Sequence, residues 1–390
     1  MIRVLHVTED HSPVNTGITS ALDALTRCVP ESIQPAIVCV GTDAIAARPG
    51  VARHTLPTSG LAAKWRYSPG SEKELARLVA ETDVVHVHGL WMWPQWAAAR
   101  LAARLAKALV VTSHGFLQPW QWQRQNWLHR LKKNIYWYGL AFPAFRQAAL
   151  IHALTPREAG VLAAFFPGAP LRVIPHGIDQ AAADQVLAGL PPKTPNSGNA
   201  PYFLFLGRLH PGKGIHLLIR AFARLPQTPF ILKIAGPTQQ REQAYADSIH
   251  RLVSELGLTD RVIFTGAVSG AAKWQLYRDA WAFCLPSFSE VIGLVNLEAA
   301  AAGTPVITSY ETGIAADWQR SGGILLHPEE ETIYAALCQA AAWAQAERQA
   351  RGAALRALVQ QQYSWARVGQ QWQDVYSELV ANHPDGVCVS

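Results

Sequence analysis

The chain has 390 residues, of which 49% are apolar and 16% are charged, and its formal net charge is +6. This composition excludes a disordered chain, and the length predicts two domains of under roughly 200 residues each. The five cysteines are scattered without any C-x-x-C spacing, which argues against a disulfide framework or a zinc site and favours the cytoplasm.

The chain begins with MIRVLHVTED, a strand pattern without the long apolar segment of a signal peptide. Further strands are expected wherever a short apolar run ends in Gly, Pro, Ser or His. In the first half these runs cover residues 2–9, 36–41, 83–89, 108–115, 150–155 and 171–177. In the second half they cover residues 202–208, 230–236, 261–267, 281–287, 305–310 and 323–328. Nearly continuous apolar strands with helices between them predict parallel sheets that are covered on both faces.

Residues 84–157 contain no Asp or Glu, but they contain nine Lys or Arg and seven of the fourteen tryptophans. If the centre of this tract is helical, Trp127, Leu131 and Ile135 share one face. A basic helix rich in tryptophan is typical of contact with a membrane interface. We therefore expect a peripheral contact with the inner membrane face. Four residues are expected to make this contact: Trp127, Arg130, Lys132 and Lys133.

Two alternatives stay open for the same tract. Its cations could bind an anionic saccharide, with Trp120 and Arg124 as contacts, or its apolar residues could pack on the sheet while the cations stay solvated. Binding of nucleic acid is the weaker use of these charges, because no nucleic-acid-binding fold is recognisable around them.

Residues 187–200, LAGLPPKTPNSGNA, interrupt the alternation and are expected to be a linker. The linker separates two α/β domains of the Rossmann type, at residues 1–190 and 200–365. Residues 366–390 are expected to form a helix that packs back toward the first domain. In open parallel sheets the ligand lies at the carboxyl ends of the strands, so the two sheets should face each other across a binding cleft.

Residues 205–218, FLGRLHPGKGIHLL, carry the spacing that opens a nucleotide-binding P-loop. A P-loop needs Ser or Thr after the lysine to hold magnesium, and this chain has Gly214 there, which argues against a nucleoside triphosphatase. Arg208 and Lys213 beside a helix start still suit a diphosphate.

Residues 286–309, PSFSEVIGLVNLEAAAAGTPVITS, place Glu290 before an expected helix and Glu298 inside it. The backbone amides of Gly293, Leu294 and Val295 would point at an anion. A carboxylate inside the first turns cannot bind phosphate, but Glu298 can accept hydrogen bonds from a ribose diol.

Together, GRLHPGKGIHLLIRAF and SEVIGLVNLEAAAAGTPVI resemble the retaining glycosyltransferases of family 4, which have the GT-B fold. The resemblance extends to IPHGID before the linker and to YSWARVGQQWQDVY near the end. It implies transfer of a hexosyl group from a nucleoside-diphosphate sugar to a glycan or a lipid-linked saccharide, with retained anomeric configuration. It also implies no cofactor and no metal, and the chain contains no Asp-x-Asp.

The resemblance also implies roles for individual residues. Arg208 and Lys213 would hold the diphosphate and stabilise the leaving group, Glu298 would bind the ribose, and Glu290 would lie beside the donor sugar. Gly17 would approach the donor phosphate, and the segment around Val268 would contact the base. In the first domain His114, at a strand end, would position the donor sugar with a catalytic role. His88 would line the acceptor pocket.

The chain departs from the family pattern at four positions: Thr16, His176, Val291 and Ile292. Val291 and Ile292 replace the usual Gly and Phe after the first glutamate, so the loop against the donor sugar has fewer backbone conformations. A GT-B protein that binds a sugar nucleotide or glycan without transfer, and a GT-B sugar-nucleotide epimerase, are the alternative functions.

Overall fold

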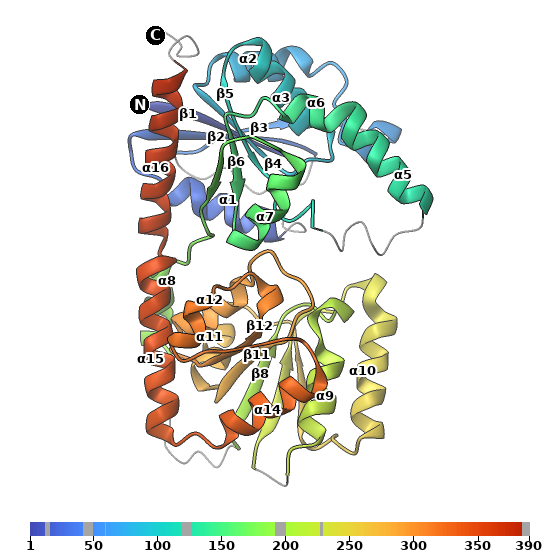
Figure 1. Cartoon of the computed structure of the whole chain (residues 1–390), viewed down its shortest axis with the longest axis vertical. Helices are drawn as coiled ribbons and strands as arrows, with labels where there is room; N and C mark the ends of the chain where they lie inside the picture. The colour runs from blue at the N-terminus through green and yellow to red at the C-terminus, as the bar shows by residue number, and fades with distance from the viewer. Residues whose placement is uncertain are drawn as a thin grey trace. The chain divides into compact units, whose positions relative to one another are not determined.

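The structure is a computed structural model that describes residues 1–11, 16–41, 50–58, 60–118, 127–191, 200–226 and 229–383. The chain forms two compact units (Figure 1). Unit 1 consists of Met1–His176 and Trp365–Ser390, and unit 2 consists of Gly177–Ser364. Each unit is a parallel sheet between helices, so the predicted α/β fold class is confirmed.

Unit 1 contains a seven-stranded sheet with the order β3-β2-β1-β4-β5-β6-β7. Its strands are β1 Ile2–Thr8, β2 Ile33–Val40, β3 Ala52–Leu56, β4 Val84–His88, β5 Ala108–Thr112, β6 Leu150–Ala153 and β7 Leu171–Val173. Its α-helices are α1 Thr16–Cys28, α2 Glu72–Ala80, α3 Trp93–Arg104, α5 Trp127–Tyr136, α6 Phe142–Phe145, α7 Pro156–Phe165 and α16 Trp365–Asn382. A 3₁₀ turn at Gly60–Trp65 and a π-helical segment at Trp137–Ala141 complete the unit.

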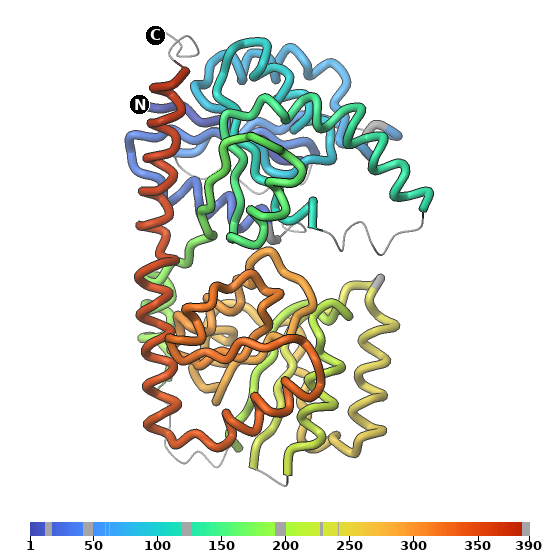
Figure 2. The backbone as a smooth tube through the Cα atoms, viewed as in Figure 1, coloured from blue at the N-terminus to red at the C-terminus, as the bar shows by residue number. Residues whose placement is uncertain are grey.

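Alternation along the strands sorts the core of unit 1 into two layers. Leu5, Val87 and Val111 pack with α3 and α6 on one face, whereas Val4 and Val84 pack with α16 on the other. His6, His86 and His88 share this second face, because they are two or four residues from Val4 and Val84. Figure 2 shows the red carboxyl-terminal helix beside the strands of this unit.

Unit 2 contains a six-stranded sheet with the order β10-β9-β8-β11-β12-β13. Its strands are β8 Tyr202–Leu206, β9 Ile231–Ala235, β10 Val262–Gly266, β11 Ala282–Leu285, β12 Val306–Ser309 and β13 Ile324–Leu326. Its α-helices are α8 Gln180–Ala188, α9 Ile215–Ala223, α10 Gln243–Glu255, α11 Gly270–Asp279, α12 Leu294–Ala301, α13 Asp317–Arg320, α14 Glu330–Ala341 and α15 Gln345–Gln362. Short 3₁₀ turns lie at Pro211–Lys213, Gln240–Glu242 and Tyr310–Thr312.

Strand β3 is the one described strand that the sequence analysis did not predict. It lies at the sheet edge, and only Leu56 is buried in it. The segment ARHTL therefore lacks the continuous apolar run that identified the other strands.

The division between the units falls earlier than the sequence analysis placed it, after His176 rather than at residue 190. Helix α8 belongs to unit 2 because its side chains bond there: Gln180 donates to the Ala301 carbonyl at 3.3 Å, and Asp184 pairs with Arg356 at 2.6 Å. The chain crosses back to unit 1 after Ser364, beside the first crossing, since the Ile178 amide donates to the Tyr363 carbonyl at 2.7 Å. Among the described residues, no helix is both long and apolar enough to span a bilayer.

Gly369 sets the distance between α16 and α1. A β-carbon at this position would lie 2.2 Å from the Cys28 carbonyl oxygen, so Gly369→Ala should force the helices apart. We expect a loss of about 1–3 kcal/mol in the free energy of unfolding, measured by urea denaturation. The matched control is Gly160→Ala in α7, where a β-carbon meets no atom within 4 Å and a gain of up to about 1 kcal/mol is expected. Equal urea midpoints for the two variants would contradict the close packing.

Candidate donor and sugar sites at the two sheet switch points

The order of strands reverses between β8 and β11 in unit 2, because the chain runs to β9 and β10 on one side and to β12 and β13 on the other. In open parallel sheets the loops at such a switch point diverge and leave room for a ligand. The two loops there are the β8–α9 loop, residues 207–214, and the β11–α12 loop, residues 286–293. These are the loops that the sequence analysis selected.

Glycine allows the two loops to touch. Gly214 has φ +70°, and a β-carbon on it would lie 2.1 Å from the Pro286 carbonyl oxygen. The Phe288 amide also donates to the Gly212 carbonyl at 2.9 Å. The glycine that stands where a P-loop has Ser or Thr is therefore a packing requirement of this fold.

Lys213 and Glu290 meet where these loops touch. The Lys213 ammonium forms an ion pair with Glu290 Oε1, and both side chains are less than one-fifth exposed. Ser287 Oγ donates to the same carboxylate oxygen at 3.1 Å, and the Glu290 amide donates to the Glu311 carbonyl at 2.8 Å. The structure thus brings together a residue predicted to bind diphosphate and one predicted to face the sugar. Arg208, in the β8–α9 loop, is exposed, and among the described residues its side chain donates to Gln239 Oε1 at 3.5 Å.

Helix α12 carries the second glutamate of the motif. Glu298 Oε1 accepts from Lys273 at 2.8 Å, and Glu298 Oε2 accepts from the Tyr277 hydroxyl at 2.9 Å. Burial, with the adjacent Glu298 carboxylate, raises the pKa of Tyr277 well above its ordinary value, so the phenol stays a donor. Lys273 was not anticipated from the sequence, where it is a single cation at the start of a helix. It would accompany Glu298 in any contact with a ribose.

The amides at the start of α12 are only partly available to an anion. The Gly293 amide donates to the Thr312 carbonyl at 3.2 Å, and the Leu294 amide donates to the Ile292 carbonyl at 3.0 Å. Of the three amides predicted to face an anion, only that of Val295 has no recorded acceptor within the described part of the chain. Val268 lies half-buried in the loop between β10 and α11, beside Gly266 with φ +70°.

Unit 1 has its own switch point, between β1 and β4. Four buried histidines lie around it, on neighbouring strands: His6, His86, His88 and His152. Burial lowers the pKa of His6 to about 3 and that of His152 to about 4, and it lowers those of His86 and His88 well below the ordinary value. These imidazoles are therefore neutral near pH 7.

His114 follows β5 and is half-buried. Its φ is +49°, a left-handed conformation that is uncommon for a residue other than glycine and that often occurs at functional sites. His88 Nδ1 lies 3.0 Å from His114 Nε2, and His176 stacks on His114 with ring centroids 5.8 Å apart. A small cavity of about 20 Å³ is lined by His88, His114 and His176 together with apolar side chains of α1 and α16.

Glu158, a residue that the sequence analysis missed, holds the backbone around His114. Its buried carboxylate accepts from Ser113 Oγ at 2.6 Å and the Gly115 amide at 2.8 Å through Oε1, and from the Leu154 amide at 2.8 Å through Oε2. In the sequence, Glu158 stands out only as the last residue of a capping-box pattern that begins at Thr155. In the structure Thr155 Oγ accepts from the Glu158 amide at 3.2 Å. That pattern predicts a helix start and gives no sign of the contacts to a distant strand.

The structure also bears on four other predicted site residues: His88, Trp120, Arg124 and Gly17. His88 is buried with both ring nitrogens hydrogen-bonded, so it has no free nitrogen for an acceptor. Trp120 and Arg124 lie outside the described residues. Gly17 lies in the first turn of α1, after the β1–α1 connection at the switch point.

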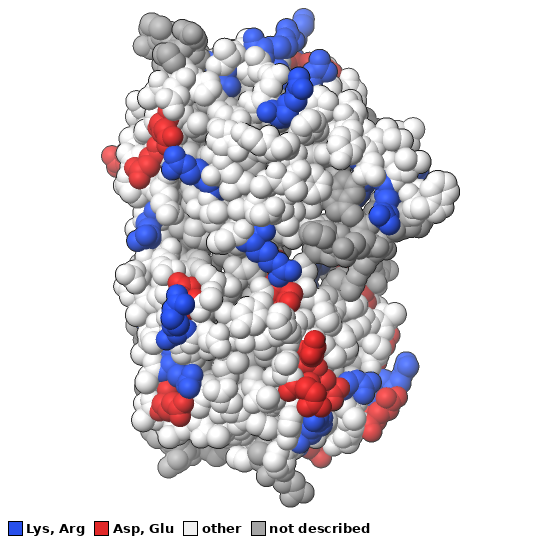
Figure 3. Space-filling view, viewed as in Figure 1, with Lys and Arg blue, Asp and Glu red and all other residues white. Residues whose placement is uncertain are grey.

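Helix α5 presents its apolar face outward. No residue of this helix is buried, and Trp127 and Ile135 are 70% and 64% exposed. Lys133 differs from the prediction, because it is half-buried with its ammonium over the Trp91 ring at 5.3 Å. At 100° per residue, Lys133 faces opposite to the exposed stripe, which Arg130 and Lys132 flank. On the face in Figure 3, blue cations and no red acids mark this helix.

Two Rossmann-like units, each with a polar site at the switch point of a parallel sheet, define a two-domain protein of the GT-B class. Residues 190–341 match the model of the glycosyl transferases group 1, and residues 16–182 match that of glycosyltransferase family 4. The chain therefore belongs to the group 1 glycosyltransferases of family 4.

Three similar proteins illustrate the relationship. D-inositol 3-phosphate glycosyltransferase of Mycolicibacterium smegmatis is 36% identical over 148 residues, which are 38% of this chain and 32% of that protein. The protein of the same name from Mycolicibacterium gilvum is 31% identical over 239 residues, 61% of this chain and 50% of that protein. The match thus spans a third to a half of these relatives. Anabaena HepE in complex with UDP has the same fold, with a TM-score of 0.77 and 18% identity over 97% of this chain and 100% of HepE.

The contacts of Glu158 make a direct prediction about stability. Glu158→Ala leaves the Ser113 hydroxyl and the Gly115 and Leu154 amides without their acceptor, so we expect a loss on the order of 3 kcal/mol in the free energy of unfolding. Urea denaturation measures it. Glu81→Ala is the control, because Glu81 pairs with Arg77 on the exposed surface and should cost under about 1 kcal/mol. A loss no larger than that of the control would show that Glu158 does not hold the loop.

Proposed function

We propose that the chain transfers a hexosyl group from a nucleoside-diphosphate sugar to a hydroxyl of a glycan or lipid-linked saccharide, with retained anomeric configuration and without a metal. The observation that carries this proposal is the meeting of Lys213 and Glu290 at the switch point of unit 2, between two loops that touch. Membership of the glycosyltransferase family supports the proposal, as does the fold that the chain shares with HepE, whose structure was solved in complex with UDP.

The diphosphate would compete with Glu290 for the Lys213 ammonium. A diphosphate carries more negative charge than one carboxylate, so the lysine should exchange partners when the donor binds. Ser287 and the backbone contacts of Glu290 would then hold the freed carboxylate beside the sugar. Arg208, which is exposed and only weakly bonded, can swing to the same phosphates.

The cations would act mainly on the leaving group. When the bond from the anomeric carbon to the phosphate oxygen breaks, negative charge grows on the diphosphate, and Lys213 and Arg208 would stabilise it. Because these residues supply fixed positive charge, no metal is needed in this scheme. Glu298, oriented by Lys273 and Tyr277, would accept from the ribose hydroxyls.

Helix α5 would bring the enzyme to its lipid-linked acceptor at the inner, cytoplasmic membrane face. Its outward apolar stripe is flanked by Arg130 and Lys132, and it carries no acidic residue. Exposure of an apolar helix face to water is unfavourable unless a partner covers it. An anionic membrane would cover the apolar stripe and attract the flanking cations.

Donor binding tests the first part of the proposal. A nucleoside-diphosphate sugar at 100 times its Kd should stabilise the chain by about 2.7 kcal/mol, seen as a higher melting temperature without added metal. Lys213→Ala and Arg208→Ala should weaken this shift, and Lys213→Ala should lower kcat by about 10²- to 10³-fold. Arg220→Ala, an exposed cation on α9, is the control and should change neither. No shift with UDP-, GDP-, ADP- or dTDP-sugars would contradict donor binding. A shift without turnover would instead favour a binding protein.

Flotation with vesicles tests the role of α5. Binding to vesicles that contain phosphatidylglycerol should fall with Arg130→Gln and Lys132→Gln, by about 1 kcal/mol for each cation, and Trp127→Ser should lower it further. Lys64→Gln with Lys73→Gln, two exposed lysines elsewhere in unit 1, should leave binding unchanged. Absence of flotation, or an equal loss in the control, would rule out the membrane contact.

A further inference from the structure

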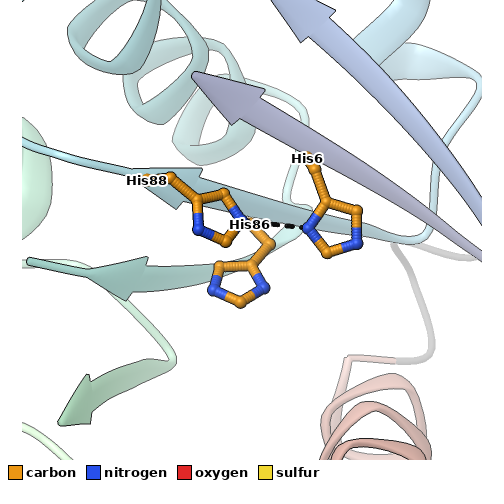
Figure 4. A group of neighbouring side chains, drawn as sticks. All are labelled: His6, His86 and His88. Atoms are coloured by element: carbon orange, nitrogen blue, oxygen red, sulfur yellow. Dashed lines mark hydrogen bonds between the residues drawn. The ribbon is translucent and has the colours of Figure 1, made fainter. Parts of the chain in front are cut away.

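Two hydrogen-bonded lines of side chains, most of them imidazoles, cross the switch point of unit 1, and the mechanism proposed above uses none of them. In the first line, His6 Nδ1 lies 3.0 Å from His88 Nε2 (Figure 4), and His88 Nδ1 lies 3.0 Å from His114 Nε2. In the second line, Tyr376, His86, Thr112 and His152 follow one another at 2.7–2.8 Å and end on the Ile174 carbonyl.

The second line has a single possible direction. A carbonyl only accepts, so His152 Nε2 carries the proton and the Nδ1 of this neutral ring is an acceptor. Thr112 must then donate to His152 and accept from His86 Nε2–H, which leaves His86 Nδ1 to accept from the Tyr376 hydroxyl. Every polar atom of this line has a partner, and the line fixes both nitrogens of His86.

This assignment bears on whether three of these histidines could hold a metal. The ligand atoms of His6, His86 and His88 lie within 4.8 Å of one another (Figure 4). However, both nitrogens of His86 and both of His88 already take part in hydrogen bonds. An ion would have to break these bonds in a buried site, so we do not propose a metal there.

The first line has two possible directions, and its inner end distinguishes them. His6 Nε2 is buried and has no partner among the described residues. If His114 donates to His88 and His88 donates to His6, then His6 Nε2 carries an N–H without an acceptor. If His6 donates to His88 and His88 donates to His114, then His6 Nε2 is an unprotonated nitrogen without a donor. Buried N–H groups without an acceptor are rarer in proteins than acceptors with unused lone pairs. The favoured direction is therefore His6 Nδ1–H to His88 Nε2, and His88 Nδ1–H to His114 Nε2.

We propose that His88 and His6 are positioning residues that hold His114 with its proton on Nδ1, so that the second ring nitrogen is a fixed hydrogen-bond donor. With Nε2 accepting from His88, only Nδ1 of His114 is left to meet a ligand. The ligand atom must then be an acceptor, such as a hydroxyl or ring oxygen of a sugar. In this state His114 cannot take a proton from an acceptor hydroxyl, so it orients the sugar and is not a base. The identity of the ligand rests on the proposed function, but the tautomer does not.

The backbone supports a fixed rather than a mobile ring. His114 is held in the left-handed region by the contacts of Glu158 to Ser113 and Gly115 on either side of it. A conformation that costs on the order of 1–3 kcal/mol persists only where the surroundings over-determine it. The backbone and the ring are thus held by separate sets of contacts.

The tautomer can be measured directly by ¹⁵N NMR of histidine-labelled protein, with the His114 signals assigned by their loss in His114→Asn. The folded wild-type chain should show Nδ1 of His114 as the protonated nitrogen. In His88→Phe the donor to Nε2 is lost, and because a free neutral imidazole prefers the proton on Nε2, the signals should move to that tautomer. His6→Asn keeps an N–H donor toward His88 and should leave His114 unchanged. His54→Phe, a half-buried histidine on β3, is the control.

The wild-type spectrum alone can overturn the proposal, even if His88→Phe does not fold. A proton on Nε2 of His114 in the wild type, or an unchanged His114 in folded His88→Phe, would show that His88 does not set the tautomer. A protonated Nδ1 in a chain that binds no sugar nucleotide would leave this assignment standing and would contradict only the proposed function.

Discussion

The reversal of strand order in each parallel sheet is the constraint on which both candidate sites depend. At the switch point the loops after two adjacent strands diverge, so polar groups can gather there while the strands stay buried on both faces. In unit 2 the loops after β8 and β11 bring Lys213 to Glu290, and in unit 1 strands β1 and β4 bring His6 to His88. Neither pair is close in the sequence, and both follow from the topology alone.

The two sites hold polar groups by different means. Lys213 and Glu290 form an ion pair in which each side chain is partly exposed to solvent. The histidines around His86 are fully buried, and an unpaired charge there would be too costly, so they stay neutral and satisfy one another by hydrogen bonds. A charged site suits an anionic diphosphate, whereas a neutral site with one oriented donor suits a sugar. The different ligand groups proposed for Lys213 and for His114 follow from this difference in burial.

Much of the fold could be predicted from the sequence, because buried parallel strands are nearly continuous apolar runs. The exception, Ala52–Leu56, lies at a sheet edge and has only one buried residue, so no such run was present. The motif residues Lys213 and Glu290 were found from their loops. Glu158 was not, because its carboxylate accepts from Ser113 and Gly115, which follow a strand over 40 residues away, and such contacts leave no local pattern. The helical pattern of α5 was visible, but only its packing on Trp91 reveals which way Lys133 points.

The most direct test of the proposed donor site is to measure hydrogen exchange of the backbone amides with and without a nucleoside diphosphate. UDP, or the diphosphate of whichever base binds, should slow exchange in residues 207–214 and 286–298, around the switch point of unit 2, and in residues 266–270, the β10–α11 loop that is expected to contact the base. Matched peptides from α10 and α14, which lie away from these loops in the sequence, should be unchanged. Protection elsewhere in the chain at saturating nucleotide, without protection of the 207–214 and 286–298 loops, would contradict a donor site at the switch point.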